Sequence, residues 1–84
     1  MSGLSVEFEA AITRLKSLGQ RPDNATLLKL YGLYKQATAG DVQGKRPGAF
    51  DLVGKFKYDA WAAIAGMPAE EAMQDYVDLV GSLQ

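Results

Sequence analysis

The sequence predicts an all-α protein, and three observations support that fold class. In four separate segments, apolar residues recur every three or four positions, which is the spacing of an amphipathic helix. No segment alternates apolar and polar residues as a half-buried strand does. The three prolines lie between the periodic segments, where helices end or begin. With 84 residues, the chain is expected to form one domain that spans residues 1–84.

The first helix is predicted from about Val6 to Leu18. Its apolar face consists of Phe8, Ile12, Leu15 and Leu18. Ser5 before this segment and Gly19 after it are suitable start and stop signals. Lys16 projects from the C-terminal part of this helix.

The second helix, from Asp23 to about Ala39, carries two different faces. Asp23 is a suitable N-cap, and its charge favours the positive end of the helix dipole. One face, which we expect in the core, consists of Leu27, Leu30, Tyr34 and Ala37. The neighbouring face consists of Leu28, Tyr31 and Lys35. An aromatic ring with a cation one turn away suits a flat base and a phosphate, although tyrosines at helical spacing more often belong to a core.

Three glycines and Pro47 exclude a continuous helix between Gly40 and Phe50 and predict a long loop. In so small a domain, a loop of this length is typically functional or packed against the body of the protein. We expect Val42, Ala49 and Phe50 to anchor it.

The third helix is predicted from its N-cap, Asp51, to Gly66, which ends it. Its apolar row of Leu52, Phe56, Ala60 and Ala63 lies beside a row of Val53, Lys57 and Trp61. Pro68 occupies a first helical position of the last helix, and two glutamates follow in the first turn. The apolar face of that helix consists of Met73, Tyr76, Val77, Val80 and Leu83.

Composition excludes several classes of site. The chain has no cysteine and no histidine, so disulfides, thiolate metal sites and the usual general base are ruled out. No serine or threonine lies in a nucleophile-elbow pattern, and there is no glycine-rich phosphate loop. We therefore predict no catalytic residue and no metal ligand. The lack of cysteine suits a reducing, cytoplasmic location, and no apolar run approaches the roughly 18 residues of a membrane span.

Charge is distributed unevenly along the chain. The net charge is −1, yet all nine basic residues lie at or before Lys57, together with five of the ten acidic residues. From Tyr58 onward there are five acidic residues and no basic one. This asymmetry can hold a polyanion on one side of the molecule. A nucleic-acid-binding protein would be basic overall with a continuous basic stripe, so we expect no nucleic-acid partner.

Three runs of sequence resemble the signature of the acyl-CoA-binding proteins. They are YGLYKQATAGD at residues 31–41, RPG at residues 46–48 and KFKYDAW at residues 55–61. The resemblance extends from Phe8 to Tyr76 without a large insertion. It implies an up-down-down-up four-helix bundle with a long loop between helices 2 and 3, and a ligand bound in a bowl on the bundle surface.

The resemblance also implies roles for individual residues in binding an acyl-CoA ligand. Tyr31 corresponds to a tyrosine that stacks against adenine. Lys35 and Lys57 correspond to lysines that bind the ribose 3′-phosphate and its neighbourhood. Lys16 corresponds to a lysine near the phosphates, and Tyr76 to a further tyrosine that contacts the ligand. Leu28 and Ile12 are expected along the acyl chain.

Three features depart from the family pattern. Val53 stands where many members carry another lysine, which predicts weaker binding of the CoA moiety. Tyr58 replaces a common tryptophan and should keep the aromatic packing. Met67 and Pro68 replace the usual hydroxyl residues, so we expect the last helix to begin with poorer capping.

Together these features predict a non-catalytic carrier of medium- to long-chain acyl-CoA esters that needs no cofactor besides the bound ligand. We expect a monomer that delivers the ligand transiently to acyl-CoA-using enzymes, without stable insertion into a membrane. The alternative is a helical protein-interaction module that uses the same aromatic face, and adenine absorbance of purified protein would distinguish the two. The family also occurs as a module beside isomerase domains, but the two ends of this chain favour a stand-alone carrier.

Overall fold

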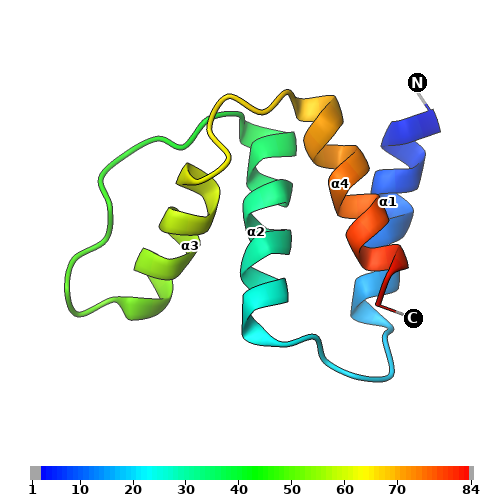
Figure 1. The fold of residues 1–84 in the computed structure, drawn as a ribbon, viewed down its shortest axis with the longest axis horizontal. Coiled ribbons are helices and arrows are strands. Elements are labelled where there is room, and N and C mark those ends of the chain that lie inside the picture. The colour runs from blue at the N-terminus through cyan, green and yellow to red at the C-terminus, as the bar shows by residue number, and fades with distance from the viewer. Residues whose placement is uncertain (1–2, 84) are drawn as a thin grey trace.

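The computed structural model describes residues 3–83, which form four helices joined by loops (Figure 1). The helices are α1 (Gly3–Lys16), α2 (Asn24–Ala39), α3 (Leu52–Ala62) and α4 (Ala69–Gly81). The predicted all-α class is confirmed. Two boundaries differ from expectation, because α1 already begins at Gly3 and α3 gives way to turns after Ala62. None of the helices within residues 3–83 has the length and apolarity to span a membrane.

The helices follow the predicted up-down-down-up order. In Figure 1, α1 and α4 run in one direction and α2 and α3 in the other, so α2 and α3 are parallel neighbours. The long loop returns the chain from the end of α2 to the start of α3. The backbone of α4 contacts α1 and α2, whereas among the described helices α3 contacts α2 alone. The molecule is flattened as a result, with extents of 38 × 29 × 15 Å.

The hydrophobic core lies between α1, α2 and α4. Its buried side chains are Phe8, Ala11, Leu30, Leu33, Ala37, Ala72, Tyr76 and Val80. The ring of Phe8 meets Tyr76 edge-on, with 5.1 Å between centroids, and stacks on Tyr34 at 6.1 Å. Such aromatic pairs contribute about 0.5–1.5 kcal/mol beyond the area they bury. Phe8 thereby connects α1 to both of the other core helices.

The predicted core face of α2 is wrong in part. Leu30 and Ala37 are buried as expected, but Tyr34 is 41% exposed and Leu27 is half-buried. Leu33 and Gln36 are buried instead. The reason is that α4 and α3 cover α2 from two sides. The buried stripe therefore extends beyond the single face that the periodicity indicated.

Gln36 joins the end of α2 to the segment that precedes α4. Its Nε2 donates to Oδ1 of Asp41 at 2.8 Å and to the Met67 carbonyl at 2.9 Å. The backbone N–H of Gly66 donates to the same Asp41 oxygen at 2.7 Å. The hydrogen bond from Gly66, and to a lesser extent the one from Gln36, holds the pKa of Asp41 below its ordinary value of 3.8. This cluster fixes the start of the long loop.

The remainder of the loop is held against α3 by polar contacts. Arg46 and Asp59 form a bidentate ion pair with both N···O distances at 2.8 Å. Their hydrogen bond lowers the pKa of Asp59 and raises the pKa of Arg46. The hydroxyl of Tyr58 donates to the Gly44 carbonyl at 3.1 Å, so the ring in the place of the family's tryptophan contributes to the loop.

The predicted apolar anchoring of the loop is wrong. Val42 is half-buried, but Ala49 is exposed and Phe50 is fully exposed. The physical reason is the position of the loop beside α3, on the opposite side of α2 from the core. Because the core surface lies out of reach, hydrogen bonds and the ion pair hold the loop instead.

The N-caps of α2 and α3 agree with expectation, whereas Pro68, predicted at a first helical position, is the N-cap of α4. Asp23 accepts a hydrogen bond from the Thr26 N–H at 2.8 Å, and Asp51 accepts one from the Gly54 N–H at 2.9 Å. At the start of α4, Pro68 provides no side-chain cap bond, which is the poorer capping predicted from its sequence.

Gly32 lies where α2 and α3 approach each other closely. A Cβ at this position would be 2.7 Å from the carbonyl oxygen of Ala60 and 3.4 Å from the backbone nitrogen of Trp61. Both neighbours are backbone atoms, which cannot rotate away. Gly32 therefore permits the spacing of the two helices.

We predict that Gly32→Ala lowers the free energy of unfolding by about 1–2 kcal/mol, because overpacking against rigid backbone costs about 2–3 kcal/mol and alanine gains back roughly 1 kcal/mol as a helix former. Gly81→Ala is the matched control, since a Cβ at Gly81 would meet nothing within 4 Å. Denaturation in urea measures both changes. Equal stability of Gly32→Ala and wild type would contradict the close approach.

We also predict that Asp41 makes the protein sensitive to acid. Its pKa is lower in the folded state than the ordinary 3.8, so its stabilising contribution is present above pH 3.8 and is lost as the pH falls through the native pKa. In Asp41→Asn, the urea midpoint should therefore decline less between about pH 5 and pH 2 than in wild type. Parallel declines in the two proteins would argue against this role.

Candidate functional site

A groove lies between α2 and α3. It encloses about 520 Å³, within the usual range for small-molecule sites. Its lining residues are Arg21, Asn24, Leu27, Leu28, Tyr31, Val53, Phe56 and Lys57. Three of the predicted contacts, Leu28, Tyr31 and Lys57, are thus brought together from two helices. The parallel packing of α2 and α3 is what places them on one surface.

Lysines and aromatic rings alternate across the two helices at one end of the groove. Nζ of Lys57 on α3 is 5.3 Å from the ring centroid of Tyr31 on α2. Nζ of Lys35 on α2 is 5.0 Å from the ring centroid of Trp61 on α3. Cation–π contacts at exposed sites contribute about 0.5–1 kcal/mol. They hold two ammonium groups beside aromatic faces, where an anionic group with a flat ring can bind.

The end of α2 positions the Trp61 ring. Its indole Nε1 donates to the carbonyl oxygen of Gly40 at 2.7 Å. Gly40 has φ 82°, in the left-handed region that favours glycine, and its N–H donates to the Gln36 carbonyl oxygen. The glycine that ends α2 therefore also orients the ring under Lys35.

The remainder of the groove is largely apolar. Leu27 and Leu28 on α2 share this lining with Val53 and Phe56 on α3. Burial of one methylene group contributes about 0.8 kcal/mol, so this surface favours an alkyl chain. Val53 lies in the lining, and the absence of a lysine at this position keeps the groove apolar here.

Sequence reasoning missed five of the lining residues, including Leu27, which was expected in the core, and Val53, which was noted only for the missing lysine. Phe56 was assigned to an apolar helix face, but its side chain is 54% exposed and lines the groove. Arg21 and Asn24 lie at the start of α2, where Nη1 of Arg21 donates to Oδ1 of Asn24 at 3.3 Å. Helical periodicity is a signal that indicates Asn24, because this residue precedes Leu28, a predicted contact, by one helical turn.

Four predicted contacts lie outside the groove lining. Lys35 follows Tyr31 by one turn of α2, beside the groove, and is held over the Trp61 ring. Tyr76 lies in the core, with only 4% of its surface exposed. Burial, and to a lesser extent the charge of nearby Tyr34, raises its pKa. Ile12 packs against the core from α1, and Lys16 is exposed at the end of α1. Their roles as ligand contacts stay predictions.

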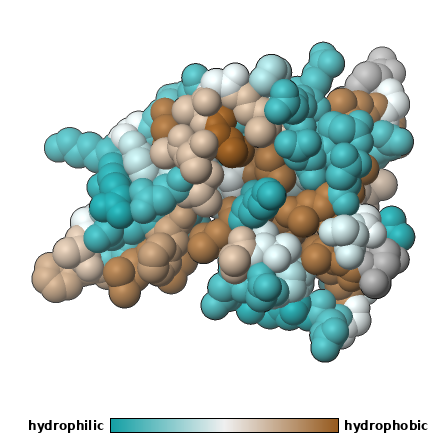
Figure 2. Space-filling view, viewed as in Figure 1, coloured by the Kyte–Doolittle hydropathy of each residue, from teal (hydrophilic) through white to brown (hydrophobic). Residues whose placement is uncertain are grey.

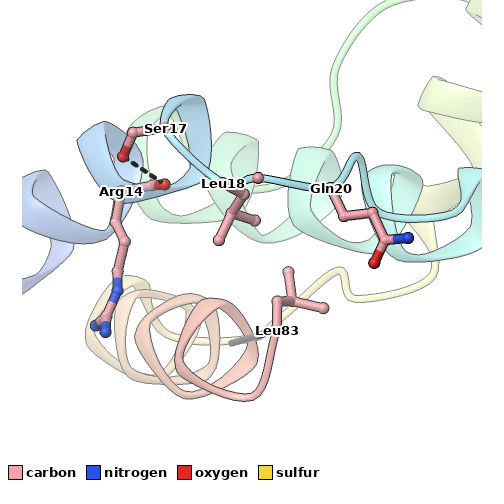
Figure 3. A pocket seen from close by; sticks show the side chains of 6 residues that line it. Arg14, Ser17, Leu18, Gln20 and Leu83 are labelled. Carbon is pink, nitrogen blue, oxygen red and sulfur yellow. Dashed lines mark hydrogen bonds between the residues drawn. The ribbon is translucent and has the colours of Figure 1, made fainter.

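A second cavity, of about 750 Å³, lies between the end of α1 and Leu83, two residues beyond the end of α4 (Figure 3). Its lining residues are Arg14, Ser17, Leu18, Gly19, Gln20 and Leu83. Figure 3 shows Leu18 and Leu83 facing each other across it. This cavity has one cation and no aromatic ring. We therefore place the candidate site in the groove between α2 and α3.

The groove is equipped for binding. Its lining contains two cations, Arg21 and Lys57, and the phenol of Tyr31, but no carboxylate. Within residues 3–83, no group of three or more histidine, cysteine, aspartate or glutamate side chains is arranged to hold a metal ion. The cations, rings and four apolar side chains of the groove suit recognition of an amphipathic anion.

Comparison with known proteins identifies close relatives. A family model described as Acyl CoA binding protein matches residues 5–80. The Acyl-CoA-binding protein of Gossypium hirsutum is 49% identical over 81 residues, which are 96% of this chain and 91% of that protein. Enoyl-CoA delta isomerase 2 of Homo sapiens is 51% identical over 77 residues, which are 92% of this chain. The chain spans only 20% of the isomerase.

Solved structures share the arrangement of the helices. The crystal structure of Oryza sativa Acyl-CoA-Binding Protein 2 superposes with a TM-score of 0.91 at 48% identity, covering 96% of this chain and 88% of that one. ACBP from Moniliophthora perniciosa gives a TM-score of 0.84 at 38% identity, covering 94% of this chain and 76% of that one. The likeness in both cases includes nearly the whole chain.

Proposed function

The chain belongs to the acyl-CoA-binding protein family, and from that premise we propose that it binds fatty acyl-CoA esters in the groove between α2 and α3. The observation that carries the proposal is the contrast between the two ends of the groove. Tyr31 and Lys57 lie in the groove next to Lys35, whereas four apolar side chains line most of the rest, with Arg21 and Asn24 at the start of α2. A CoA thioester is divided in the same way, into a phosphorylated nucleotide and an alkyl chain.

Each end of the groove has its own task in this proposal. Adenine stacks on the Tyr31 ring and displaces the Lys57 ammonium group from that ring toward a phosphate. Charge-assisted hydrogen bonds from Lys35 and Lys57 contribute about 1.5–3 kcal/mol each. Leu28 lies along the acyl chain, where about ten buried methylenes contribute roughly 8 kcal/mol before ordering costs. Chain length therefore dominates affinity, and medium- to long-chain esters bind best.

The proposed activity is carriage of the ligand, without catalysis and without a further cofactor. The isomerases from Homo sapiens and Rattus norvegicus match over about a fifth of their length, so the matched helices account for a small part of those proteins. The absence of a carboxylate in the groove lining supports assigning binding, rather than isomerisation, to these helices. In this proposal the protein is a cytoplasmic monomer that passes acyl-CoA transiently to enzymes that use it.

Isothermal titration with a C16 acyl-CoA, free CoA and the free C16 fatty acid tests the proposed function. We expect tight one-to-one binding of the thioester and far weaker binding of the other two, because only the thioester occupies both ends of the groove. If none of the three ligands bound, the family fold would be present here without the ligand site, and the proposal would fail.

Lys35→Ala should weaken binding of the C16 acyl-CoA by about 1.5–3 kcal/mol through loss of a charge-assisted hydrogen bond. Lys29→Ala is the matched control, because Lys29 is an exposed lysine of the same helix, whereas Lys35 is the one held over the Trp61 ring beside the groove. Circular dichroism should be unchanged in both variants. Equal affinities of the two variants would remove Lys35 from the site.

A further inference from the structure

An exposed apolar patch surrounds the start of α3. It consists of Phe50, Leu52, Val53 and Phe56, of which Phe50 is fully exposed and each of the others more than half exposed. Figure 2 shows hydrophobic side chains gathered at the lower left, over this end of α3. The other large exposed hydrophobics of the described residues, Val6 and Tyr34, lie on α1 and α2. Contiguous exposed apolar surface of this kind marks an interaction site.

Basic residues accompany the apolar patch. Between residues 42 and 58 there are four cations, Lys45, Arg46, Lys55 and Lys57, and one anion, Asp51. The Asp51 carboxylate caps α3, and Arg46 is paired with Asp59. Lys57 is held over the Tyr31 ring in the groove, so Lys45 and Lys55 remain to meet negative charge outside the molecule. The acidic residues of α4 belong to a different part of the bundle, because α4 makes no backbone contact with α3 among the described residues.

We propose that the apolar patch docks reversibly on the surface of an anionic lipid bilayer. Phe50 and Leu52 enter the boundary between headgroups and acyl chains, while Lys45 and Lys55 meet the lipid phosphates or carboxylates. An apolar face bordered by lysines is the combination that binds such surfaces. A fluid bilayer also receives the fully exposed ring of Phe50 without requiring a matching pocket.

The apolar patch is continuous with the groove. Val53 and Phe56 belong to both surfaces, so an alkyl chain leaving a bilayer reaches the groove along apolar side chains. This passage rests on the proposed function, whereas docking itself does not depend on a ligand. Phe50 and Leu52 are outside the groove lining, which allows the two properties to be tested separately.

Co-sedimentation with phosphatidylcholine vesicles, with and without about 30% phosphatidylserine, tests the docking. We expect binding to the anionic vesicles that weakens with added salt. The double variant Phe50→Ser/Leu52→Ser should bind at least about fivefold more weakly. Val6→Ser is the matched control, because Val6 has a comparable exposed fraction of 56% on α1, and it should bind as wild type does.

Charge is tested by Lys45→Glu, which should also reduce binding to the anionic vesicles, with Lys29→Glu as the unaffected control. Three results would overturn the proposal. They are absence of binding to the anionic vesicles, equal losses in a variant and its control, and equal binding to both kinds of vesicle. Self-association or protein capture through the same residues, without vesicle binding, would count as absence of binding and assign the patch to a protein partner.

A titration with C16 acyl-CoA accompanies each vesicle measurement. The Phe50→Ser/Leu52→Ser variant should retain wild-type affinity for the ligand, which also establishes that it is folded. Failure of the wild type to bind acyl-CoA, together with normal vesicle binding, would refute the proposed function and leave the docking proposal standing.

Discussion

The contact between Gly32 of α2 and the backbone of Ala60 in α3 sets the spacing on which the groove depends. No other described helix has backbone contact with α3, so its packing on α2, together with the polar contacts of the loop, determines how α3 is placed. Tyr31 and Lys35 then meet Lys57 and Trp61 from the facing helix. A wider separation would part each lysine from its ring and open the apolar lining to water.

The segment that resembles the family signature combines folding and binding. Within residues 31–41, Tyr31 and Lys35 belong to the groove, whereas Gln36 and Asp41 form the hydrogen bonds that close the end of α2 against the segment before α4. The later RPG and KFKYDAW runs divide similarly, because Arg46 pairs with Asp59 and Lys57 reaches the Tyr31 ring. Much of the signature therefore specifies the loop that presents the site.

Helical periodicity and caps were enough to predict the four helices and their order in the chain, since Asp23, Asp51 and Pro68 mark their starts. The direction of the helices came from the family resemblance. Periodicity failed at Tyr34 and Gln36, because it assumes that a helix buries one face and α2 is covered on two. It also gave Phe50 an anchoring role, since sequence alone does not reveal on which side of α2 the loop runs. For Ile12, Lys16, Lys35 and Tyr76, the resemblance supplied a role at positions that the groove lining does not include.

The absence of any fully buried residue in α3 has a consequence for dynamics. Segments with few buried apolar contacts open locally at a lower free energy than the whole fold. α3 and its loop therefore form a separate opening unit, whose amide hydrogens exchange with solvent before those of α1, α2 and α4. A molecule held between α2 and α3 bridges that unit to the rest and slows its exchange by mass action. Such a molecule thus adds packing contacts at α3, the helix that has no fully buried residue of its own.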